Sequence, residues 1–180
     1  MIIAKEKKKE NISEYILYMW QVEDMIRASK FNIESIDKGI IQKFNQPDNI
    51  KKEMKEWYTH LIQMMRNEQI VEKGHLQFVK NTLNDLYNTH LILLKSTEEL
   101  EYIDTYNKVH ADIQDLLQKS KGEAENEIEA GFNGLYGLLL MRLQGKNISA
   151  STNSAILAIS KLIALLSKKH MAIEKGDVEL

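Results

Sequence analysis

Four side chains that can bind ligands or exchange protons lie on the apolar faces of the helices that this sequence predicts: Glu23, His90, His110 and Arg142. Each falls in line with hydrophobic residues when the chain is plotted at 100° per residue, the repeat of an α-helix. A polar residue where the pattern demands an apolar one is informative, because an isolated buried charge is very costly. Each of the four is therefore expected to have a partner.

Three interpretations of these residues are open at this point: a structural one, a functional one, and simple exposure at the end of a helix. In the structural one, Glu23 pairs with Arg142, or with Arg27 four residues further along its own helix, and the histidines lie neutral and hydrogen-bonded in the core. In the functional one, the same groups converge from separate helices, with Glu68 as a further candidate. Polar residues that meet in this way form metal or small-molecule sites in helical bundles.

The segment 15–27, YILYMWQVEDMIR, concentrates aromatic and charged residues on one short stretch of helix. Trp20 and Asp24 flank its apolar face, where a residue that lines a groove or contacts a partner would lie. An ordinary border between the core and the solvent gives the same pattern.

Three glycines recur every three residues within a helical pattern, at Gly131, Gly134 and Gly137. This spacing predicts the close approach of a neighbouring helix, and room for a flat ligand beside Tyr136 is the alternative. The candidate ligand-binding residues are Trp20, Glu23, Arg27, His90, His110, Tyr136 and Arg142.

Common catalytic and metal-binding motifs are missing from the sequence. Di-iron bundles repeat Glu-x-x-His, and the one match here, from Glu72 to His75, contains a glycine that should end the helix. The sequence has no His-x-x-x-His, no Gly-x-Ser-x-Gly and no cysteine. We therefore expect neither a metal nor a cofactor, and we do not expect an enzyme.

Composition favours long helices and excludes several classes of partner. The 180 residues include one proline, eight glycines and no cysteine, which is too few chain breakers for a turn-rich β protein. The net charge is −2 and there are three arginines, so we expect no binding to nucleic acid. The residues 155–166 form a twelve-residue apolar stretch containing Lys161, too short to span a membrane, and the N-terminus lacks a signal peptide. These features predict a cytoplasmic protein without a membrane partner.

Apolar residues recur at helical spacing almost throughout and predict one domain over residues 1–180, an antiparallel bundle of about six long helices and one short helix. Asn32, Ser149 and a capping box from Ser96 to Glu99 are predicted to begin helices, and Pro47 and Gly74 to separate them. The helix over 124–144 is apolar nearly all round, which predicts a central position. The predicted helices span residues 5–28, 33–44, 48–73, 75–95, 97–119, 124–144 and 150–175, followed by a frayed tail from Gly176.

Two stretches of the chain resemble a known family: residues 3–28, IAKEKKKENISEYILYMWQVEDMIRA, and residues 134–149, GLYGLLLMRLQGKNIS. They are similar to an uncharacterised bacterial family of all-helical proteins of about this length, defined as a domain of unknown function. The resemblance implies an all-helical cytoplasmic protein, and it implies no activity, substrate or site residue.

Taken together, these observations predict a non-catalytic helical-bundle protein that binds an unknown protein partner or forms a homo-oligomer. The alternative is a bundle that binds a small molecule or a metal at a buried polar site and could act as an enzyme.

Overall fold

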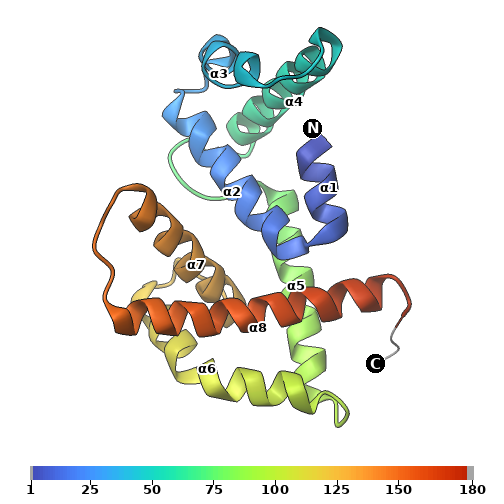
Figure 1. Ribbon diagram of the computed structural model, residues 1–180, viewed down its shortest axis with the longest axis vertical. Coiled ribbons are helices and arrows are strands. Elements are labelled where there is room, and N and C mark those ends of the chain that lie inside the picture. Colours follow the sequence, from blue (N-terminus) through green and yellow to red (C-terminus); the bar gives the residue numbers. More distant parts are fainter. Residues whose placement is uncertain (1, 178–180) are drawn as a thin grey trace. The chain divides into compact units, whose positions relative to one another are not determined.

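A computed structural model describes residues 2–177, which form eight α-helices and a short 3₁₀ helix and contain no strand (Figure 1). The predicted all-α class is confirmed, and the predicted tail continues, after Asp177, beyond the described residues. The elements are α1 (Ile2–Glu10), α2 (Ile12–Ala28), α3 (Ile33–Gly39), η1 (Ile41–Lys43), α4 (Asp48–Asn67), α5 (Gln77–Lys95), α6 (Leu100–Lys119), α7 (Glu127–Leu143) and α8 (Ala150–Glu174).

The chain, predicted as one domain, divides by its contacts into two compact units. Unit 1 comprises Met1–Glu10 and Glu14–Asn81, and unit 2 comprises Asn11–Ser13 and Thr82–Leu180. In unit 1, α3 and η1 pack on α4. Lys55 of α4 connects these elements because its ammonium group lies 2.8 Å from Glu34 and 2.9 Å from Asp37 of α3. The hydrogen bond from this ammonium group, followed by that from Gln42, lowers the pKa of the Asp37 carboxyl.

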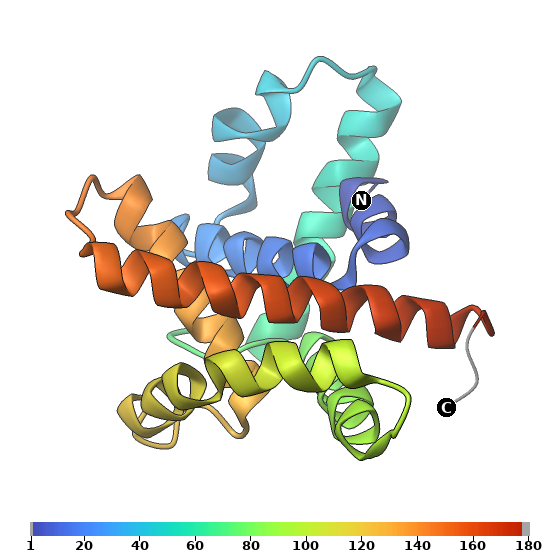
Figure 2. The same ribbon diagram turned by 60° about the horizontal axis from the view of Figure 1, so that its bottom comes forward.

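In unit 2, α6, α7 and α8 pack on one another, and α6 runs alongside α8 (Figure 2). A Cβ built on Gly131 would lie 3.1 Å from Ile163 and 3.3 Å from Ile159. One on Gly134 would lie 2.8 Å from Leu116 and 3.0 Å from Ile156. The predicted close approach of neighbouring helices is confirmed at these two glycines, whereas Gly137 has nothing within 4 Å of such a Cβ.

The helix predicted over 5–28 is interrupted at Asn11, which the apolar pattern does not reveal. The Asn11 side-chain oxygen accepts hydrogen bonds from the Ser13 amide at 3.0 Å and from the Ser167 hydroxyl of α8 at 3.1 Å. Asn11 therefore begins a new helix in the manner of an N-cap. The break depends on a tertiary contact, since Ser167 lies far away in the sequence.

The other predicted boundaries have mixed outcomes. Asn32 and Ser149 cap α3 and α8 as predicted, by accepting backbone N–H groups. The capping box is wrong, because Ser96 accepts from the Glu98 amide while Glu99 forms an ion pair with Lys169.

The third predicted helix was also extended too far. It ends at Asn67 instead of near residue 73, and the chain then turns through Gln69, whose φ is +58°. Gly74, at a φ of +96°, lies within the resulting loop of residues 68–76 and does not end α4.

Burial of α7 stops part of the way along the helix, so the predicted central position is wrong for its C-terminal part. Phe132 and Leu138 are buried, whereas Leu139, Leu140 and Met141 are half-buried and Leu143 is 74% exposed. The periodicity shows that a helix is apolar on all sides, but it does not show how many sides have neighbours.

The adjoining helix α8 is long and apolar enough to cross a membrane by length and composition, with a third of its most apolar window buried. Its residues Ile159 and Ile163 pack against Gly131 of α7. The apolar residues of α8 thus contribute to the packing of unit 2. A buried core helix of a soluble protein passes the same test of length and composition.

Candidate functional site

A fully buried carboxylate in unit 1 holds one nitrogen of a histidine. Glu23 of α2 has a side-chain exposure of 0%, and its Oε2 lies 2.6 Å from Nδ1 of His75. Its other oxygen, Oε1, accepts the backbone N–H of Leu76 at 2.9 Å, immediately before α5 begins. Both carboxylate oxygens are thus engaged, and neither predicted partner of Glu23, Arg27 or Arg142, is the one observed.

Neighbouring side chains fix the position of the His75 ring. Trp20 stacks on it, with ring centroids 4.2 Å apart and planes inclined by 13°. Arg27 holds the loop that precedes the histidine, because its guanidinium donates to the carbonyl oxygens of Ile70 and Gly74 and also pairs with Asp24. Three candidates from the sequence, Trp20, Glu23 and Arg27, therefore lie together around His75.

The His75 ring borders an open depression of about 420 Å³. The side chain is 25% exposed, and among residues 2–177 no hydrogen bond reaches its Nε2 atom. The depression is lined by Glu68, Ile70, Gly74, His75, Gln77 and Lys80. Glu23 binds the ring from the protein interior, and the opposite edge of the ring, which carries Nε2, faces solvent.

Unit 2 contains a second carboxylate–imidazole pair with the opposite burial. His90 of α5 is fully buried, and both its nitrogens are bound within the protein. Nδ1 lies 2.6 Å from the hydroxyl of Tyr102, and Nε2 lies 3.0 Å from Oε1 of Glu127. Glu127, in the first turn of α7, retains 13% exposure.

The hydrogen bonds continue from Glu127 to the surface. Its Oε2 accepts the Tyr106 hydroxyl at 2.6 Å and the Gln114 amide at 3.2 Å. His110, one turn further along α6, places Nδ1 2.7 Å from the Tyr106 hydroxyl. An ionised carboxylate only accepts hydrogen bonds, so His90 donates from Nε2 and, when neutral, accepts from Tyr102 at Nδ1. Every polar atom named here then has a partner.

Charge and burial shift the pKa values in this network in opposite directions. The hydrogen bond from His90, followed by that from Tyr106, lowers the pKa of the Glu127 carboxyl. Burial, with the negative charge of Glu127 as a smaller cause, raises the pKa values of Tyr102 and Tyr106. The network therefore favours one charge state, a carboxylate surrounded by neutral phenols.

The remaining candidates from the sequence lie elsewhere. Arg142 is exposed and donates to Asn153 of α8 at 2.7 Å, so its predicted core-facing position is wrong. His110 is exposed, in contrast to its predicted core-facing position, and Glu68, the further candidate, is also exposed. Tyr136 is half-buried on α7. Arg142 and Glu68 lie at helix ends, where helical periodicity overestimates burial because fewer neighbours cover the helix, whereas His110 lies midway along α6.

Sequence analysis missed His75 and Glu127 as members of these sites. His75 follows Gly74 in a loop, so a plot of helical faces could not place it. Glu127 directly follows Asn126, whose side chain caps α7, and it resembles the acidic residues that are common in any first helical turn. The adjacency of Gly74 and His75 just before a new apolar run was the one available signal.

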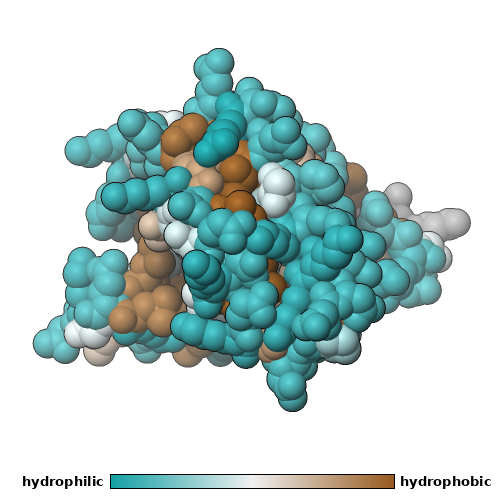
Figure 3. All heavy atoms as spheres, turned by 90° about the horizontal axis from the view of Figure 1, so that it is seen from above, coloured by the Kyte–Doolittle hydropathy of each residue, from teal (hydrophilic) through white to brown (hydrophobic). Residues whose placement is uncertain are grey.

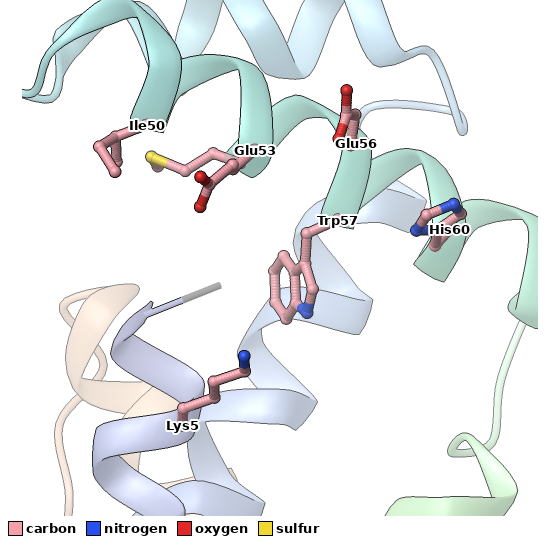
Figure 4. A pocket seen from close by; sticks show the side chains of 7 residues that line it. Lys5, Ile50, Glu53, Glu56, Trp57 and His60 are labelled. Carbon is pink, nitrogen blue, oxygen red and sulfur yellow. The ribbon is translucent and has the colours of Figure 1, made fainter.

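A second hollow in unit 1 has an aromatic wall (Figure 4). It measures about 260 Å³ and lies between α1 and α4. The indole of Trp57 and the amine of Lys5 point toward each other across it, and the Glu53 carboxylate points into the same space. Ile50, Met54, Glu56 and His60 complete the lining.

Within residues 2–177, no group of three or more His, Asp or Glu side chains is arranged to hold a metal ion. The imidazoles and carboxylates described above occur instead as pairs and hydrogen-bonded chains. Such pairs and chains can transfer protons, exchange hydrogen bonds and present a nucleophilic nitrogen.

Comparison with protein families gives one assignment. The family model described as Domain of unknown function (DUF4924) matches residues 1–177. The chain belongs to this family. The resemblance found in the sequence is thus confirmed at the level of a domain of unknown function. Neither the curated proteins nor the solved structures provide a match.

Proposed function

We propose that this DUF4924 protein acts without catalysis, in the bacterial cytoplasm, by associating with a second copy of itself or with another protein. The observation that carries the proposal is the incomplete burial of α7. Its sequence is apolar on all sides, yet Leu143 at its end is 74% exposed and Leu157 of the adjoining α8 is 56% exposed. Large exposed apolar patches commonly mark interaction sites.

The chemistry of this region also favours a protein partner. Leu139, Leu140 and Met141 are half-buried beside Leu143, so apolar atoms extend over the C-terminal part of α7. Seen from above, the surface of the molecule is mostly hydrophilic and carries several hydrophobic patches (Figure 3). The scarcity of arginine argues against nucleic acid as the partner, and the packed side of α8 argues against a membrane.

The first test is the mass of the protein in solution, with and without charge on this surface. Light scattering is expected to give a mass above that of the 20.9 kDa chain for the wild type. A double variant, Leu143→Glu with Leu157→Glu, should shift the protein toward the monomer, because a charge cannot be buried without a partner.

Leu100→Glu provides the matched control, since Leu100 is 69% exposed in the same unit but at the start of α6. This control should keep the wild-type mass. A wild-type monomer would exclude self-association, and the α7–α8 variants should then lose whichever partner protein the wild type retains. Failure of both experiments would reject the proposal.

A second candidate function, small-molecule binding, is favoured by the hollow beside Trp57. An indole, an ammonium and a carboxylate around about 260 Å³ suit a zwitterion that also carries an apolar group. The Lys5 amine would pair with the carboxylate of the ligand and Glu53 with its ammonium, while Trp57 contacts the apolar part.

Free phenylalanine is a suitable probe for this hollow. Its addition should shift the NMR signal of the Trp57 indole, and Lys5→Ala or Glu53→Gln should weaken the binding. The signal of the buried Trp20 indole serves as the internal control. An unchanged Trp57 signal at millimolar phenylalanine would exclude this class of ligand.

A further inference from the structure

The five histidines of the chain differ in which partners bind their ring nitrogens and in whether a nitrogen remains accessible to solvent. His90 is fully buried with both nitrogens bound. His110 and His170 each place Nδ1 against a hydroxyl, of Tyr106 and Thr89. His60 is exposed at the end of the hollow beside Trp57. Within the described part of the chain, His75 alone combines a carboxylate at Nδ1 with an Nε2 atom left toward an open depression.

This arrangement determines the tautomer of His75. The Glu23 carboxylate accepts the Leu76 amide at one oxygen, so its other oxygen accepts the proton on Nδ1. The lone pair of the neutral ring then lies on Nε2. Stacking on Trp20 restrains the ring, which keeps that lone pair in a fixed direction. A carboxylate behind an imidazole also stabilises any positive charge that the ring acquires when Nε2 reacts.

We propose that His75 is a phosphoryl acceptor, a residue whose Nε2 atom takes a phosphoryl group from a small phosphoryl donor and carries it as phosphohistidine. The Nε2 lone pair forms the new N–P bond while the bond from phosphorus to the leaving group breaks. With phosphoramidate as the donor, ammonia leaves with the electron pair of its P–N bond. The ring keeps its proton on Nδ1, and its positive charge lies beside Glu23.

The walls of the depression contain charges of both signs. Lys80 supplies a positive charge that suits the incoming phosphoryl oxygens. Glu68 supplies a negative charge, although one of its oxygens accepts a hydrogen bond from the backbone N–H of Gln77 at 2.7 Å. The proposal therefore predicts that Lys80→Ala slows the reaction and that Glu68→Gln accelerates it.

The central test is incubation of the full-length protein with phosphoramidate, followed by ³¹P NMR and peptide mass spectrometry. We expect one phosphoryl group on His75, released by acid and stable to base as an N-phosphohistidine. His75→Asn should abolish this signal, and His60→Asn should leave it unchanged.

Glu23→Gln tests whether Glu23 acts by setting the tautomer of His75 or only by stabilising the fold. A glutamine can accept the Leu76 amide but donates to Nδ1, which moves the ring proton to Nε2 and removes the lone pair there. The rate should fall about 100-fold although His75 is still present. Unfolding by urea and the ¹⁵N shifts of the ring would show that the fold is intact and the tautomer reversed.

Three outcomes would overturn the proposal. They are phosphorylation spread equally over His60, His75 and His110, an unchanged rate in His75→Asn, and an unchanged rate in a folded Glu23→Gln variant with the reversed tautomer. None of them depends on the association state, so this proposal and the proposed function fail separately.

Discussion

The two units contain the same pair of chemical groups arranged in opposite ways. In unit 1 the carboxylate of Glu23 is fully buried and the imidazole of His75 is a quarter exposed. In unit 2 the imidazole of His90 is fully buried and the carboxylate of Glu127 retains 13% exposure. An imidazole with both nitrogens bound can only support the fold, whereas one with a free nitrogen at the surface can also react. The same pair therefore has a structural role in unit 2, and in unit 1 it has the proposed chemical role.

The largest expected difference between the two pairs lies in stability. His90→Ala removes the partner of the buried Tyr102 hydroxyl and of Oε1 of Glu127 and opens a cavity. It should lower the free energy of unfolding by about 3 kcal/mol. His75→Ala should cost only about 1 kcal/mol, because water from the open depression can reach Glu23. Urea denaturation of both variants measures the difference. Equal losses would mean that His75 is as structural as His90.

A smaller effect should separate two glycines of α7, the helix that carries Glu127. Gly134→Ala should cost about 1 kcal/mol, because its methyl group would press on Leu116 and Ile156. Gly137→Ala should instead stabilise the protein by up to about 1 kcal/mol, since the helix gains propensity and, within residues 2–177, no neighbouring element lies within 4 Å of the added methyl group. Thermal melting of the two variants tests whether neighbouring helices pack tightly at Gly134 and not at Gly137. A loss in both would show close packing at Gly137 too.

The smallest expected effect concerns pH. The pKa of Glu127 is lower in the folded protein than its ordinary value of 4.5. The stability that it contributes is thus fully present above that value and is lost as the pH falls through the folded pKa. Glu127→Gln should flatten this part of the stability profile, as followed by urea denaturation at successive acidic pH values. An unchanged slope would remove Glu127 from the acid sensitivity of the fold.

The sequence allowed the helical class, most helix limits and two buried polar residues to be predicted. Glu23 and His90 were found because they interrupt apolar stripes on long helices. The same reasoning placed His110, midway along α6, on a buried face, although it is exposed. The partners were not found. His75 lies in a loop that has no periodicity, and Glu127 lies in a first helical turn, where acidic residues are ordinary. Arg142 was misplaced because the end of α7 lacks the neighbours that its apolar sequence predicts.

Gly74 makes the His75 site sensitive to mutation at the preceding residue as well as at the histidine itself. Gly74 has a φ of +96°, which side-chain-bearing residues rarely adopt, and a Cβ there would lie 3.2 Å from Ile70. Almost any substitution of Gly74 would therefore shift the loop and, with it, the ring of the next residue. In a mutational screen, changes at Gly74 should resemble loss of His75 itself, although glycine contributes no reactive atom. The codon for this glycine should then be under as much selection as the codon for the histidine.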